Sequence, residues 1–164
     1  MKEIYHRVSV RKYTDEPVKE EDILQILKAA MQAPSTANQQ PWEFYVVTNR
    51  EILKKLSEMG PNVKLLENAP AAIVFAARED IPLPEFAPLD MSICVENIWL
   101  ETDYLGLGGV MMGLYPMADR QAIATELCGM KEGLKAFCMF AFGYPAESRE
   151  PQDRFDESRI HYVK

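Results

Sequence analysis

The chain has 164 residues, 48 % of them hydrophobic, which is enough for one domain with a sizeable core and too few for two comfortable ones. The formal net charge of -7 argues against general binding to nucleic acid or an anionic membrane, because both partners attract a basic face. The N-terminus has no apolar signal region, and no run approaches the ~18–20 apolar residues of a membrane span. We therefore expect one cytoplasmic domain over residues 1–164 that contacts neither nucleic acid nor membrane.

A short basic segment near the N-terminus alternates polar and apolar side chains. If it is extended, Arg7, Ser9 and Arg11 project to one side. Val8 and Val10 then project to the other side, where they can enter a core. Two guanidinium groups and a hydroxyl suit a phosphate, because Arg matches its geometry with paired, charge-assisted hydrogen bonds. The same residues also fit an ordinary solvated basic segment.

Helices are predicted by apolar residues at helical spacing and by capping residues. The first covers residues 20–33 and lies between Pro17 and Pro34, which fit its boundaries. Asn49 can cap the second helix, and Asp90 the third. The other predicted helices cover residues 50–59, 90–105 and 119–128.

Strands are predicted by short, continuously apolar runs between these helices. They cover residues 43–48, 71–77 and 136–142, with a shorter apolar segment at 110–112. Three prolines predict a surface loop over residues 81–88. Helices and strands interleave, so we expect both to share one layered α+β domain.

A second polar segment, residues 34–42, is a proline-bounded loop without net charge. Its neutral donors and acceptors suit a polar heteroaromatic ring or a sugar-like chain better than an ion; they are Ser35, Thr36, Asn38, Gln39 and Gln40. Alternatively, these side chains satisfy the backbone of their own turn.

The remaining reactive residues do not form a recognisable catalytic set. We expect no histidine base for Ser9, and the two histidines, His6 and His161, stand at opposite ends of the chain, so no metal-ligand spacing exists. The glycines of residues 106–109 follow a helix and depart from Gly-x-Gly-x-x-Gly, which argues against a dinucleotide fingerprint. Glu96 lies in an apolar helix, so we expect a buried or interface partner for it. Buried, reduced thiols are expected at Cys94, Cys128 and Cys138.

Several motifs, in this order, resemble the nitroreductase family of FMN-dependent oxidoreductases. The first two are Arg-x-Ser-x-Arg-x-Tyr near the N-terminus and Ala-Pro-Ser-x-x-Asn-x-Gln-Pro-Trp at residues 33–42. The others are Asn68-Ala69-Pro70, Glu96-Asn97-Ile98, Leu105 to Val110, Phe142 to Glu147 and Asp153 to Asp156. The resemblance covers nearly the whole chain.

The resemblance implies a three-layer α/β/α fold, with a central mixed, mainly antiparallel sheet between helices in an intertwined homodimer. It also implies FMN as cofactor and NADH or NADPH as reductant. A hydride would pass through flavin N5 to a nitroaromatic, quinone or similar small-molecule acceptor in a ping-pong cycle. The flavin carries this chemistry, so no catalytic side chain is expected.

The resemblance also assigns cofactor contacts, and the flavin would lie at the homodimer interface. The phosphate would be held by Arg7, Ser9 and Arg11, joined by Arg154 or, as a weaker candidate, by Arg149. The isoalloxazine and ribityl chain would lie against Pro34, Ser35, Asn38 and Gln40 of the other subunit. Backbone N–H groups would approach flavin N5 and O4 from Met111, Met112 and Gly113.

Two features depart from the family pattern. Val8 separates Arg7 from Ser9, which leaves the register of the phosphate contacts open by one residue. Residues 78–90 are short and rich in proline where many relatives carry a longer excursion. Two other functions fit the sequence: a flavin-binding or sensing protein without turnover, and a small soluble partner protein that binds another anion.

Overall fold

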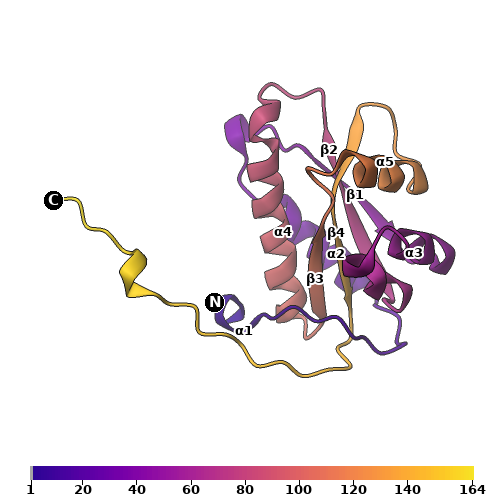
Figure 1. Cartoon of the computed structure of the whole chain (residues 1–164), viewed down its shortest axis with the longest axis horizontal. Helices are drawn as coiled ribbons and strands as arrows, with labels where there is room; N and C mark the ends of the chain where they lie inside the picture. The colour runs from indigo at the N-terminus through magenta and orange to yellow at the C-terminus, as the bar shows by residue number, and fades with distance from the viewer. Residues whose placement is uncertain (1) are drawn as a thin grey trace.

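A four-stranded antiparallel sheet forms the centre of the computed structural model, which describes residues 2–164 (Figure 1). The strand order is β1-β2-β4-β3. The strands are β1 (Trp42–Val47), β2 (Ala71–Arg78), β3 (Gly108–Gly113) and β4 (Leu134–Gly143). Each predicted strand is confirmed within two residues at either end. Among the described residues, the one parallel pairing is an isolated bridge from Ser9 to Gly109.

Helices cover both faces of the sheet, which confirms the predicted three-layer α+β fold. One face carries α2 (Glu20–Met31) and α4 (Ala87–Tyr104). The other carries α3 (Arg50–Ser57), the 3-10 helix η2 (Pro61–Glu67) and α5 (Ala118–Leu127). Four short helical turns are α1 (Glu3–His6), η1 (Thr36–Asn38), η3 (Pro84–Phe86) and η4 (Glu157–Arg159). No helix within residues 2–164 has both the length and the apolar character to cross a membrane.

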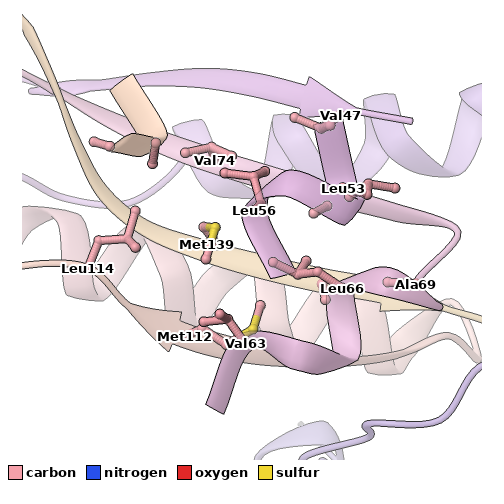
Figure 2. Packing of buried hydrophobic residues seen from close by; sticks show 14 of the residues in the cluster. Val47, Leu53, Leu56, Val63, Leu66, Ala69, Val74, Met112, Leu114 and Met139 are labelled. Atoms are coloured by element: carbon pink, nitrogen blue, oxygen red, sulfur yellow. The ribbon is translucent and has the colours of Figure 1, made fainter. Parts of the chain in front are cut away.

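The core on the α3 side shows how these layers are held together (Figure 2). Leu53 and Leu56 of α3 and Leu66 of η2 are fully buried against the sheet, where they meet Val74 and Met139. Fully burying a side chain of this size stabilises the fold by roughly 1.5–3 kcal/mol. Asn49 caps α3 as predicted, because its Oδ1 accepts hydrogen bonds from the backbone N–H groups of Glu51 and Ile52.

The predicted start of the long helix is wrong. α4 begins at Ala87, three residues before Asp90, because Pro88 fits the first turn of a helix. Asp90 is not its N-cap but lies 2 % exposed inside the protein. The expected surface loop over residues 81–88 therefore holds η3 and the start of α4.

The cysteines are free thiols, and two of the three are buried as predicted. Cys94 and Cys138 lie in the core, whereas Cys128 is only partly buried, so the prediction of burial is wrong there. Burial raises the pKa of Cys94 to about 12 and that of Cys128 to about 11, because it disfavours the thiolate.

The two ends of the chain meet beside β3. Val10 donates its backbone N–H to the Gly109 carbonyl at 3.1 Å, and Tyr13 forms a bridge with Pro145. Beyond this contact the C-terminal tail is extended, and Figure 1 shows it running away from the three layers. Nearly all of its residues from 148 onward are exposed.

Candidate functional site

The N-terminal segment adopts the alternating arrangement that its sequence predicts. Val10 is buried in the core, while Arg7, Ser9 and Arg11 line a polar cavity of about 430 Å³. Val8 packs against the core but also contributes to the lining of this cavity. The Tyr13 hydroxyl fixes the segment by donating to the backbone carbonyl of Val10 at 2.7 Å. The two guanidinium groups and the hydroxyl therefore share one site.

The C-terminal tail supplies the opposite wall of this polar cavity. Arg149 and Arg154, the two distant cations named from the sequence, both line it. Glu147 ties the walls together, since its Oε1 accepts the backbone N–H of Arg11 at 2.8 Å and lies 3.1 Å from Nε of Arg149. The Arg11 hydrogen bond, and then Arg149, lower the pKa of Glu147. Four guanidinium groups thus gather between two segments far apart in sequence.

Arg7 is the most enclosed cation of the polar cavity, with a side chain 12 % exposed. Its guanidinium carbon lies 4.2 Å from the centroid of the Trp99 ring, and its Nε lies 3.9 Å from Glu96 Oε1. One terminal guanidinium nitrogen is buried without a hydrogen-bond partner among residues 2–164. Such a donor is costly unless an acceptor reaches it.

The expected buried partner of Glu96 is found, since the side chain of Arg7 is only 12 % exposed. Glu96 itself is not buried. Its side chain is 52 % exposed, and its partner is Arg7 of the same subunit. α1 brings the two together, because His6 Nδ1 lies 2.8 Å from Asp103 Oδ2 of α4. The N-terminal turn is thereby fixed on the helix that carries Glu96.

A second, mainly apolar cavity of about 370 Å³ lies between α4 and the edge strand β3. It is linked to the polar cavity through Arg7, which contacts two residues of its lining, Trp99 and Glu96. Met111 and Gly113 also line it.

Backbone alternation decides which groups of β3 are available to the apolar cavity. The Gly109 carbonyl points away from β4 toward the N-terminal segment, so the backbone groups of Met111 and Gly113 point to the same free edge. Met112 points its side chain into the core on the other face of the sheet, where it is 4 % exposed. Met111 and Gly113 therefore reach this cavity and Met112 does not.

A β-bulge shapes the far end of the apolar cavity. The pairing of β2 with β4 shifts at Phe75, so that Phe137 of β4 has no partner residue on β2. Both Phe137 and Cys138 line the cavity. The Phe137 carbonyl accepts the backbone N–H groups of Leu114 and Tyr115, and the Tyr115 ring stacks on Phe137 at 5.6 Å. Nothing in the local sequence signals this bulge, because it arises from the pairing of distant strands.

The polar loop lies apart from both cavities in this subunit. Within residues 2–164, neither cavity is lined by Pro34, Ser35, Asn38 or Gln40. Some of its groups satisfy one another: Ser35 Oγ accepts the backbone N–H of Gln40 at 2.9 Å, and the Gln40 amide donates to Asn38 at 3.0 Å. Pro34, Asn38 and Gln40 are nevertheless exposed. The structure thus joins the basic segment to the tail, but not to this loop.

The chemistry of the paired cavities suits a ligand with an anionic end and a planar apolar part. The guanidinium groups match a phosphate, and one donor of Arg7 lacks a partner among residues 2–164. The apolar cavity and the free edge of β3 suit a ring with polar atoms along one side. A flavin mononucleotide fits both halves.

Comparison with known proteins agrees with this fold. A protein-family model described as "Nitroreductase family" matches residues 4–60 and 58–144. A protein of Archaeoglobus fulgidus named "Putative NADH dehydrogenase/NAD(P)H nitroreductase" is 44 % identical over 172 residues, covering 100 % of this chain and 97 % of that protein. The crystal structure of a "Putative NADH Oxidase" from Clostridium acetobutylicum is 43 % identical, with a TM-score of 0.94 and 99 % of both chains covered.

A third relative extends the comparison to a protein described by its cofactor. The structure named "FMN-dependent Nitroreductase" from Clostridium difficile R20291 has a TM-score of 0.91 and is 30 % identical, covering 99 % of this chain and 98 % of that one. The chain therefore has the three-layer α+β fold of these relatives. Its basic cavity lies beside the edge strand β3. The chain belongs to the nitroreductase family.

Proposed function

We propose that this protein is an oxidoreductase that uses FMN as cofactor and NADH or NADPH as reductant. When bound, FMN supplies the redox chemistry, passing a hydride from NAD(P)H through its N5 to a nitroaromatic, quinone or similar acceptor in a ping-pong cycle. The observation that carries this proposal is the pairing of an arginine-lined cavity with an apolar one along the free edge of β3.

The phosphate of FMN would be held by Arg7, Ser9, Arg11 and Arg154. Hydrogen bonds to charged groups contribute roughly 1.5–3 kcal/mol each, so three such contacts give about 5–9 kcal/mol. Burial of the ring adds to this free energy, and association subtracts several kcal/mol. Micromolar or tighter binding is reasonable on this arithmetic. Arg149, held by Glu147, adds positive charge at the rim.

The ring would occupy the apolar cavity beside β3. The backbone N–H groups of Met111 and Gly113 would donate to its polar edge, and such fixed donors stabilise negative charge that develops there. Met112 would support this edge from the core, since its side chain fills the opposite face. Trp99 and Phe137 would help to exclude water from the ring.

A second copy of the chain would complete the site. The loop with Pro34, Ser35, Asn38 and Gln40 lies away from the cavities of its own subunit, so its ring contacts would be made in the other one. An exposed apolar stripe on α4 is available for this contact: Leu89, Ile93 and Tyr104. We therefore propose a homodimer with FMN at its interface.

Reduction of the purified protein tests this function. FMN should stabilise the protein thermally and give it a flavin absorbance, which anaerobic NADH or NADPH should bleach. Addition of a nitroaromatic or a quinone should then restore the absorbance. A colourless protein that FMN does not stabilise would overturn the proposal. A yellow protein that neither nucleotide bleaches would indicate the flavin-binding protein without turnover.

A further inference from the structure

A buried carboxylate holds the polar loop from inside the protein. Asp90 of α4 is 2 % exposed, and its Oδ1 accepts the backbone N–H and the hydroxyl of Thr36 at 2.9 and 3.1 Å. Its Oδ2 accepts the side-chain amide of Gln39 at 2.7 Å. Three donors from the loop thus compensate one buried charge, as a carboxylate removed from water requires.

Gln39 extends this hold to two other parts of the chain. Its buried amide group pairs with the backbone of Leu83 in both directions, each at 3.1 Å. Arg78, at the end of β2, donates to the carbonyls of Gln39 and Gln40 at 2.8 and 2.9 Å. The loop is therefore fixed from α4, from the segment before α4 and from the sheet.

The backbone that these contacts hold is strained. Ala37, Asn38 and Gln40 have φ values of 49°, 53° and 46°, in the left-handed region that residues with a side chain rarely adopt. Such conformations persist where the surroundings over-determine them, and they gather at functional sites. This backbone conformation turns Thr36 and Gln39 inward and leaves Asn38 and Gln40 exposed.

We propose that Asp90 is a positioning residue for the cofactor. It holds residues 35–40 in the conformation that presents Ser35, Asn38 and Gln40 to the flavin ring, while touching no part of FMN itself. The loop is then ordered before the cofactor arrives, so less conformational freedom is lost on binding. This inference rests on the proposed function, in which the loop contacts the ring.

The test compares FMN with riboflavin, which has the same ring and ribityl chain but no phosphate. Asp90→Asn keeps the shape of the side chain but sets an amide group against the Gln39 amide. The dissociation constants of FMN and riboflavin should both rise about tenfold and by similar factors, because the loop must then be ordered when either flavin binds. The visible circular dichroism of the bound flavin should change as well, which a purely structural role would not require.

A rescue variant separates positioning from general stability. Glycine adopts the φ of Ala37 without strain, so Ala37→Gly added to Asp90→Asn should recover part of the affinity for both flavins. Asp119→Asn, on the exposed surface of α5, is the matched control and should leave both dissociation constants unchanged.

The possible results test the positioning role of Asp90 and the proposed function separately. Unchanged riboflavin affinity and flavin spectrum in folded Asp90→Asn, or a loss confined to FMN, would overturn the positioning role. If Asp90→Asn does not fold, Thr36→Val removes only the hydroxyl donor to Asp90, and the same criteria apply to it. Wild-type protein that binds neither flavin would overturn the proposed function instead.

Discussion

At the scale of single residues, Arg7 is the cation whose surroundings most favour binding of an anion. The stack on Trp99 and the nearby Glu96 hold its guanidinium in place, and one of its donors has no partner within the described chain. Its orientation is therefore set before any ligand binds. That combination favours the proposed anion site over a solvated basic segment, because a solvated arginine keeps its donors in water.

Replacement of Arg7 tests this interpretation. Arg7→Ala should weaken FMN binding by about tenfold or more, the equivalent of roughly 1.5–3 kcal/mol, and riboflavin binding much less. Flavin fluorescence titrations measure both affinities. Arg120→Ala, which removes a cation that bonds to Asn62 away from the cavities, should change neither. Equal losses for the two flavins would mean that Arg7 serves the fold.

Protonation of Glu147 at low pH should weaken its contacts in the polar cavity. Its pKa is lowered from 4.5, so its contribution to stability is present above that value and is lost as the pH falls through the lower pKa of the folded state. The NMR shift of the Arg11 amide, which donates to Glu147, should titrate with a midpoint below 4.5. Glu147→Gln should abolish this titration, and a midpoint above 4.5 would contradict the assignment.

At the scale of elements, close backbone approach places the basic segment. The glycines that begin β3 leave room for side chains on both sides: a Cβ on Gly108 would lie 2.6 Å from Val10 Cγ2, and one on Gly109 would lie 2.3 Å from Phe140 Cζ. Gly108 therefore lets Val10 pack beside the parallel bridge from Ser9 to Gly109. It helps to position the proposed phosphate site without lining it.

A methyl group at position 108 should therefore disturb both the fold and the site. Gly108→Ala should lower the free energy of unfolding by about 1–3 kcal/mol, the usual cost of overpacking, and should weaken FMN binding by displacing Ser9. Urea unfolding and an FMN titration check the two effects. A variant with wild-type stability and affinity would show that the segment shifts without cost.

The local sequence predicted that these helices and strands exist, but it did not predict their exact ends or how the strands pair. Apolar runs located three of the four strands, the short apolar segment at 110–112 falls within β3, and Asn49 marked the start of α3. Asp90 was misplaced as a cap because an aspartate before an apolar helix has the same local pattern whether it faces solvent or a buried loop. The bulge at Phe137 depends on the register between β2 and β4, which no local pattern states.

At the scale of the whole molecule, one chain provides only part of the proposed cofactor site. Among the described residues, those of the polar loop line neither cavity, and α4 leaves an apolar stripe exposed. The extended tail adds further exposed apolar side chains, among them Phe155 and Tyr162. These features are explained together if a second copy packs on α4.

A charge on the α4 stripe should prevent this association. Wild-type protein should sediment at about twice 18.7 kDa at micromolar concentration, whereas Ile93→Glu should sediment as a monomer with weakened FMN binding. Ile123→Glu is the matched control, since Ile123 on α5 is 43 % exposed and Ile93 is 42 % exposed. A wild-type monomer that binds FMN tightly would refute the shared site.

The sequence by itself determined the layered α+β fold and the orientation of the basic segment. Both follow from local periodicity, which places Val10 in the core and Arg7 on the opposite side. Only the tertiary structure decided that the tail closes the polar cavity, that Trp99 holds Arg7, and that Asp90 holds the polar loop. These contacts join residues tens of positions apart, and their geometry depends on how the sheet and helices pack.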